Sequence, residues 1–189
     1  MLTDKAKEII NGVKSKMEDS IQFLEEDLKT YRVGKANPSI LNNVMVDYYG
    51  SQTPVPQVAS VTVPDARTIA IQPWEKNMIG PIEKAIINAN LGFTPQSNGE
   101  VIRCPIPPLT EERRKELIKK AKATGENIKV AVRNARRDGV DALKKAEKAG
   151  DFSEDVRKEG EDEIQKATDA KVKAVDELVS AKEKEILTV

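Results

Sequence analysis

The sequence predicts an α+β protein in which a long antiparallel three-helix bundle carries an inserted small mixed α/β domain. Two observations support this fold class. Apolar side chains recur with a helical period in the first 31 residues and again from residue 110 to the end of the chain. All ten prolines lie between Pro38 and Pro108, where most of the β-branched runs and turn dipeptides also occur. The helical parts therefore flank a segment of different character.

The first helix is expected within residues 3–31. Its apolar residues recur about every 3.6 residues, the period of an amphipathic helix. They are Ala6, Ile10, Val13, Met17, Ile21, Leu24, Leu28 and Tyr31. Thr3 is a suitable N-cap, because its hydroxyl oxygen can accept a hydrogen bond from the first turn. Gly34 and Pro38 then interrupt the pattern.

The proline-containing segment predicts short strands and one helix. The expected elements are strands over residues 44–49, 59–63, 68–72 and 101–103, and a helix over residues 81–90. Pro64-Asp65 is expected to form a turn between two of the strands, and Asn98-Gly99 another. Gly92 lies just beyond the expected helix, at a position where glycine commonly ends helices.

Two further helices are expected in the C-terminal half, from Thr110 to about Ala149 and from Ser153 to about Leu187, separated by Gly150. The expected apolar residues of the last helix are Val156, Ile164, Ala167, Ala174, Leu178 and Ala181. Helices of this length need to bury their apolar stripes, which predicts a bundle with the first helix. We therefore expect a discontinuous bundle of residues 1–31 and 106–189, with residues 32–105 as the inserted domain.

Two chain crossings connect these domains, at residues 32–38 and 104–108. Gly34 can absorb changes in backbone dihedrals, whereas the prolines of the second crossing restrict them. Arg32, Val33, Gly34, Cys104 and Pro105 are the candidate hinge residues. A fixed joint explains the same residues, and the sequence does not choose between the two.

The charges are segregated along the chain although the net charge is zero. Residues 110–150 contain 13 Lys and Arg against 7 Asp and Glu, and residues 151–189 contain 7 against 12. On the second helix, several cations fall within an arc of about 100° at 100° per residue. They include Lys122, Lys129, Arg133, Arg136 and Arg137. Leu117, Ala121, Ile128, Val132, Ala135 and Ala146 lie on another side of this helix.

A row of cations on a rigid helix suits a polyphosphate backbone, so these five side chains are candidate RNA-binding residues. Arginine supports this interpretation because its guanidinium group contacts phosphate through two hydrogen bonds. The alternative is that a basic helix simply lies beside an acidic one in the bundle. Charge alone does not separate the two.

Composition argues against catalysis. The chain has no histidine, which excludes the commonest general base and metal ligand. It has one cysteine, Cys104, which excludes a disulfide framework and a thiolate zinc site and is expected to be a packing residue. No phosphate-binding loop, metal-ligand spacing or membrane-spanning apolar stretch occurs. We expect neither an enzyme nor a cofactor, and no small-molecule substrate.

Several motifs along the whole chain resemble one family, the ribosome recycling factors. The motifs lie at residues 32–38 (RVGKANP), 46–50 (VDYYG), 73–74 (PW), 91–92 (LG), 102–103 (IR), 109–114 (LTEERR) and 129–138 (KVAVRNARRD). Departures from the family pattern are Lys35, where arginine is frequent, and Gly80, where a capping serine is common.

The resemblance implies a two-domain, L-shaped protein with the outline of transfer RNA. Its bundle would bind the large ribosomal subunit and its ribosomal RNA after termination, with Arg133 as the main contact. Its smaller domain would meet elongation factor G, which uses GTP to split the ribosome. The implied protein is a cytoplasmic monomer.

Two other classes are compatible with parts of the sequence. A coiled-coil adaptor explains the helices but not the arginine face, and a helical RNA-binding arm would normally accompany a catalytic domain. Sedimentation with large ribosomal subunits separates an adaptor from a recycling factor.

Overall fold

The computed structural model describes residues 1–188 and divides them into two compact units. Met1–Tyr31 and Glu111–Thr188 form the bundle unit, and Arg32–Thr110 form the inserted unit. Residues 106–110 therefore group with the inserted unit, five residues beyond the expected boundary. One reason is that the Ile106 amide donates to the Arg67 carbonyl over 2.7 Å. Val189, the last residue of the expected bundle, lies outside the described residues.

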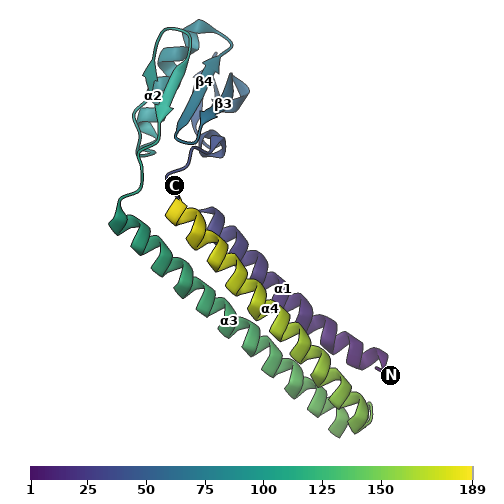
Figure 1. Ribbon diagram of the computed structural model, residues 1–189. Helices are drawn as coiled ribbons and strands as arrows, with labels where there is room; N and C mark the ends of the chain where they lie inside the picture. The colour runs from purple at the N-terminus through teal and green to yellow at the C-terminus, as the bar shows by residue number, and fades with distance from the viewer. Residues whose placement is uncertain (189) are drawn as a thin grey trace. The chain divides into compact units, whose positions relative to one another are not determined.

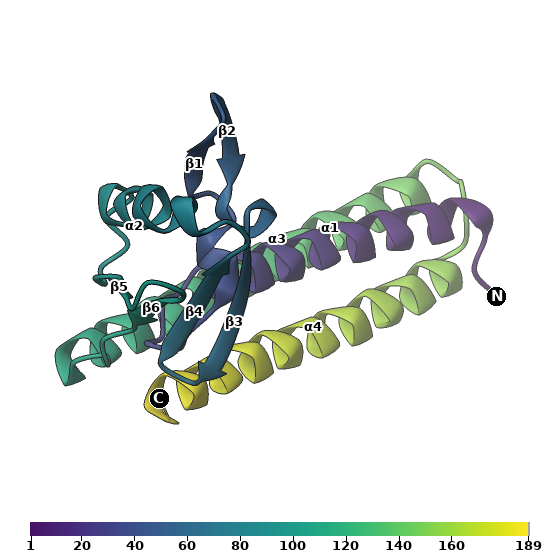
Figure 2. The same ribbon diagram turned by 90° about the horizontal axis from the view of Figure 1, so that it is seen from above.

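The bundle unit consists of three helices that pack along their lengths. They are α1 (Asp4–Lys29), α3 (Glu111–Lys148) and α4 (Glu154–Thr188), which run side by side in both ribbon views (Figures 1 and 2). A tight connection around Gly150, whose φ is 81°, turns the chain from α3 back along α4. The three long helices predicted from sequence are confirmed. Thr3 caps α1 as expected, because its hydroxyl oxygen accepts from the Ala6 amide over 3.3 Å.

The buried faces of α1 and α3 are those that the helical period indicates. All eight periodic apolar side chains from Ala6 to Tyr31 are buried, as are the six expected apolar residues of α3. Three glycines, Gly125, Gly139 and Gly160, are also buried at helix contacts. Because glycine has no Cβ, the helices can approach closely at these three points.

The face of α4 was predicted less well. Ile164 is fully buried, but Ala181, expected in the apolar stripe, is exposed. Val175 and Ile186 are buried instead, together with Thr168, whose hydroxyl donates to the Ile164 carbonyl over 2.8 Å. This intrahelical bond satisfies the hydroxyl, so a threonine can take a core position that hydropathy alone assigns to an apolar residue.

The inserted unit combines a four-stranded antiparallel sheet, a hairpin and one α-helix. The sheet order is β3-β4-β6-β5, from β3 (Ala59–Asp65), β4 (Thr68–Pro73), β6 (Ile102–Pro105) and β5 (Gln96–Ser97). The hairpin pairs β1 (Met45–Tyr48) with β2 (Ser51–Pro54), and the helix is α2 (Ile79–Asn88). Short 3-10 turns occupy Pro38–Leu41, Val55–Gln57 and Lys76–Met78.

One local expectation for this unit was wrong, and one strand was missed. The turn expected at Pro64-Asp65 lies two residues later, because Asp65 still pairs with Thr68 across an irregularity in the β3–β4 register. Proline is tolerated there because β3 is an edge strand with one unpaired side. The strand β2 was not predicted. Its residues, Ser51-Gln-Thr-Pro54, form a strand through pairing with β1 rather than through hydrophobic alternation.

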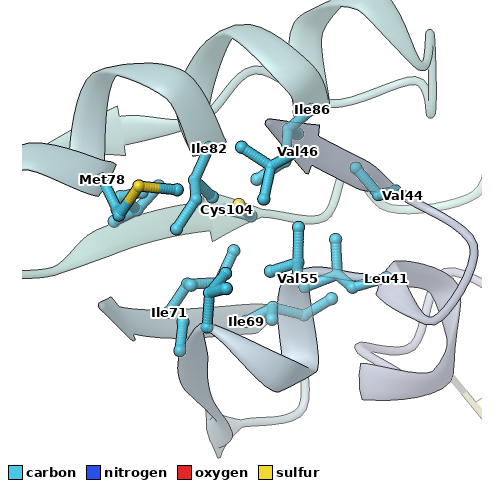
Figure 3. Close-up of a cluster of buried hydrophobic side chains, with 13 residues drawn as sticks. Leu41, Val44, Val46, Val55, Ile69, Ile71, Met78, Ile82, Ile86 and Cys104 are labelled. Atoms are coloured by element: carbon cyan, nitrogen blue, oxygen red, sulfur yellow. The ribbon is translucent and has the colours of Figure 1, made fainter. Parts of the chain in front are cut away.

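The core of the inserted unit lies between α2 and the strands. In Figure 3, Ile82 of α2 points toward Ile71 and Cys104 of the sheet, and Ile86 of α2 and Ile69 of the sheet belong to the same cluster. All five side chains are fully buried. Cys104 is thus a packing residue, as expected, and burial raises the pKa of its thiol to about 11. A thiol that stays protonated under ordinary conditions is a poor nucleophile.

Candidate RNA-binding surface

The basic residues predicted on one face of the second long helix all lie on α3, but they are in different environments. Arg133 and Arg137 are exposed, and no residue within 1–188 forms a hydrogen bond or ion pair with either guanidinium group. Lys122, Lys129 and Arg136 are instead engaged by side chains of α4. The helix-pairing interpretation therefore holds for Lys122, Lys129 and Arg136, whereas the side chains of Arg133 and Arg137 are accessible from outside the bundle.

Lys122 and Lys129 form ion pairs across the α3–α4 contact. The Lys122 ammonium lies 3.4 Å from Glu183, and the Lys129 ammonium lies 2.5 Å from Asp176 and 3.2 Å from Glu126. The Lys129 side chain is only 15% exposed. Its hydrogen bond to Asp176, and next that to Glu126, raises the pKa of Lys129. The positive charges of these two lysines are thus largely balanced within the bundle.

These contacts repeat with a seven-residue spacing. Lys122, Lys129 and Arg136 follow one another at intervals of seven on α3, and Glu183, Asp176 and Asp169 follow in reverse order on α4. Such spacing keeps side chains on the seam between two packed helices. We call the three contacts the interhelix ladder: Lys122–Glu183, Lys129–Asp176 and Arg136–Gln165–Asp169.

The third contact of the interhelix ladder differs from the other two. Arg136 does not meet the carboxylate directly, because Gln165 lies between them. The Arg136 Nε donates to Gln165 Oε1 over 2.7 Å, and Gln165 Nε2 donates to Asp169 Oδ1 over 2.9 Å. A neutral amide thus holds the guanidinium group, whereas carboxylates hold the two lysines.

A hollow of about 520 Å³ lies between α3 and α4 at this contact. Its walls include Arg133 and Arg136 from α3, and Gln165, Asp169, Lys173 and Asp176 from α4. Among the five predicted residues, only Arg133 and Arg136 line it. Lys122 and Lys129 line a neighbouring hollow of about 420 Å³, and Arg137 lines neither.

Gln165 and Lys173 are members of this surface that sequence reasoning missed. Both lie on α4, whose net charge is negative and does not by itself indicate an RNA-binding surface. The signal that could have found this part of α4 is the matched seven-residue spacing of α3 cations and α4 carboxylates. That signal requires the antiparallel register of the two helices, which is set by packing.

The candidate hinge residues are divided between a loop and a strand. The Arg32 Nη1 donates to the Leu91 carbonyl over 3.1 Å, and Val33 is buried. Gly34 has a φ of 76°, and a Cβ there would lie 3.3 Å from the Leu109 backbone nitrogen. Cys104 and Pro105 belong to β6, where they pair with Ile69 and Thr68 of β4. They are therefore anchored in the sheet, and the chain leaves the inserted unit only after them.

Within residues 1–188 there is no helix of sufficient length and hydropathy to cross a bilayer. Nor do the described side chains include a cluster of three or more Cys, Asp or Glu residues placed to hold a metal ion.

Comparison with known proteins identifies the family. The model of the family described as "Ribosome recycling factor" matches residues 24–187, most of the chain. The chain belongs to the ribosome recycling factor family. A ribosome-recycling factor of Parabacteroides distasonis is 55% identical over 183 residues, covering 97% of this chain and 98% of that protein. One from Staphylococcus aureus is 52% identical, covering 96% and 99%.

Solved structures of ribosome recycling factors share the fold. The solution structure of one such factor aligns over 100% of both chains with a TM-score of 0.74 and 34% identity. A second match is the T. thermophilus ribosome recycling factor in a structure that also contains the E. coli elongation factor G, both bound to the E. coli post-termination complex. It covers 99% of this chain and 100% of that one, with a TM-score of 0.59 and 43% identity. The α+β class predicted from sequence is confirmed.

Proposed function

We propose that this chain recycles ribosomes after termination, binding the large ribosomal subunit and splitting the post-termination complex together with elongation factor G and GTP. The observation that carries the proposal is family membership over nearly the whole chain. The T. thermophilus relative, 43% identical, is bound to a post-termination complex together with elongation factor G. Because this chain aligns with that relative from end to end, we expect it to bind the same partners.

The RNA contact of the bundle is made by the arginines of α3. Arg133, Arg136 and Arg137 carry charges that no carboxylate contacts directly within residues 1–188, so they can neutralise phosphates of ribosomal RNA. Lys122 and Lys129 contribute less to this contact, because each already faces a carboxylate of α4. Their main role is to hold α3 and α4 in register.

The inserted unit and its two chain crossings carry the response to elongation factor G. Arg32, Val33 and Gly34 form the first crossing, and the segment following Cys104 and Pro105 forms the second. Two crossings restrict motion to fewer paths than a single linker would allow. A push on one unit is therefore transmitted to the other.

The protein itself performs no bond chemistry in this proposal. The chain has no histidine, and its single thiol is buried with a raised pKa. The energy for splitting comes from GTP hydrolysed by elongation factor G. The protein acts as a monomer without a cofactor, in the cytoplasm where the ribosomes are.

The test is a subunit-splitting assay on post-termination complexes. Light scattering should fall when the full-length chain, elongation factor G and GTP are all present, and remain constant when any one is omitted. Sedimentation should show the chain travelling with purified large subunits, less so as salt increases, because phosphate contacts release counterions. A chain that sediments alone at low salt, or that never accelerates splitting, would exclude the proposed function and leave a helical adaptor.

A further inference from the structure

The third contact of the interhelix ladder has an arrangement that helix pairing alone does not require. Asp169 occupies the position that matches Glu183 and Asp176, yet Gln165 separates it from Arg136. We infer that Gln165 is a positioning residue that holds Arg136 without neutralising it, so that the hollow between α3 and α4 binds one phosphate group of RNA. This inference rests on the proposed RNA-binding role of the bundle.

The hydrogen bond to Gln165 leaves most of the Arg136 guanidinium group available. Arginine has five N–H donors, and only its Nε is used here. Within residues 1–188 no acceptor is bound to its two terminal nitrogens. Those nitrogens form the edge that contacts two oxygens of a phosphate in a bidentate pair. Fixing the Nε therefore orients the phosphate-binding edge and removes part of the entropy cost of ordering a long side chain.

The orientation of the Gln165 amide is set by Asp169. Because the Gln165 Nε2 donates to Asp169 Oδ1 over 2.9 Å, the amide oxygen is directed to Arg136. An amide with its ends exchanged would place two donors together at Arg136 and two acceptors together at Asp169. The chain Arg136–Gln165–Asp169 thus has one favourable arrangement, and it keeps the carboxylate one side chain away from the guanidinium group.

The charge distribution of the hollow favours an anion. Arg133, Arg136 and Lys173 line it, against two carboxylates, Asp169 and Asp176. Each carboxylate already accepts a hydrogen bond, Asp169 from Gln165 and Asp176 from Lys129. Lys173 lies 3.9 Å from Glu177, and both side chains are well exposed, so this pair is weak. Three cations therefore remain to share a phosphate.

Two substitutions separate this role from simple packing. Gln165→Glu keeps the shape of the side chain and converts the contact into an ion pair like the other two. Gln165→Met keeps the length and the helix propensity but removes the acceptor. Asn11→Asp is the matched control, because it adds the same negative charge at an exposed position of α1. The full-length variants are titrated with purified large ribosomal subunits at several salt concentrations and melted thermally.

We expect both Gln165 variants to bind large subunits more weakly, and Asn11→Asp to bind like the unchanged chain. For Gln165→Glu the loss should be about 5-fold to 150-fold, the range for one bidentate arginine contact. Its plot of log affinity against log salt should be shallower by about 1, as for one lost phosphate contact. The thermal midpoints of all three variants should stay close to that of the unchanged chain. If Gln165 only stabilised the bundle, weaker binding would be accompanied by a lower thermal midpoint.

The possible outcomes separate the inference from the proposed function. If the unchanged chain binds and Arg133→Ala weakens binding, but either Gln165 variant binds normally, the inference is overturned while the proposed function stands. If the unchanged chain shows no salt-dependent binding, both fail. If Gln165→Glu has a lowered thermal midpoint, the test rests on Gln165→Met. Normal affinity of Gln165→Met for large subunits would overturn the inference. Weakened affinity with an unchanged thermal midpoint would support it.

Discussion

Gly139 of α3 packs directly against Val13 of α1. A methyl group at position 139 would overlap the Val13 side chain and would lie 3.1 Å from Ile164 of α4. All three helices of the bundle therefore meet at one residue without a side chain. Glycine is costly inside a helix, by about 1 kcal/mol relative to alanine, so its presence in the middle of α3 indicates a packing requirement.

We predict that Gly139→Ala destabilises the bundle although alanine is the better helix former. Overpacking costs about 1–3 kcal/mol, which exceeds or offsets the gain in propensity. The measurement is the free energy of unfolding in urea. Gly12→Ala is the control, because Gly12 lies on α1 with nothing within 4 Å of its added methyl, and it should be neutral or stabilising. Combining Gly139→Ala with Val13→Ala should recover part of the loss, and strict additivity of the two would contradict the overlap.

Arg133→Ala should weaken large-subunit binding by about 1–3 kcal/mol, the range for one arginine contact to nucleic acid. The bundle should be unaffected to within about 0.5 kcal/mol, since Arg133 is exposed. Val132→Asp, at the preceding residue, should instead lower the thermal stability of the bundle, because Val132 is fully buried and a charge there is costly. Thermal melts and splitting rates on both variants provide the test. An Arg133→Ala chain that recycles normally would remove this residue from the RNA contact.

Lys129→Met is predicted to affect stability more than binding. Lys129 is almost covered and pairs with Asp176, so its loss should cost up to about 1 kcal/mol of unfolding free energy. A double-mutant cycle with Asp176→Asn measures the coupling, which should account for most of that cost. Large-subunit affinity should fall less than for Arg133→Ala. An equal fall would mean that Lys129 contacts RNA directly and that the ion pair is not its main role.

Gly34→Ala should destabilise the inserted unit more than Gly50→Ala does. Both glycines have positive φ, 76° and 84°, and so both substitutions carry a backbone cost of about 1–2 kcal/mol. Only at Gly34 would the new methyl also approach the Leu109 backbone, whereas nothing lies within 4 Å at Gly50. The difference between the losses of unfolding free energy of the two variants, measured in urea, gives the cost of the steric contact at Gly34. Equal losses would show that residue 109 yields freely and that the first crossing is not tightly packed.

The inserted unit should lose stability as pH rises from 9 toward 11. Burial, reinforced by the nearby Glu83 carboxylate, raises the pKa of Cys104 from 9.0 to about 11. The unfolded thiol ionises first, so stability that is complete below pH 9 falls until the folded thiol also ionises. Cys104→Ala should be less stable at neutral pH because it leaves a cavity, but its unfolding free energy should depend less on pH in this window. If the unfolding free energies of the two chains depended on pH in the same way, Cys104 would not be the group responsible for the loss of stability.

The sequence by itself determined the helices, the position of the insertion and the candidate RNA-binding residues. Helix formation and apolar periodicity are local, so Ala6 to Tyr31 and Leu117 to Ala146 identified two buried faces without knowledge of any partner. Proline positions likewise located the inserted unit, because proline is excluded from helix interiors. The family motifs at residues 32–38 and 129–138 then indicated the function that the comparisons support.

Only the tertiary structure decided which cations of α3 remain free. On a helical wheel Lys129, Arg133 and Arg136 are equivalent, yet Lys129 meets Asp176, Arg136 meets Gln165 and Arg133 meets solvent. The partners lie on another helix, and the register between helices is set by the packing of residues such as Gly125 and Gly139 against α1 and α4. An ion pair depends on the distance between two side chains, which periodicity along one helix does not contain.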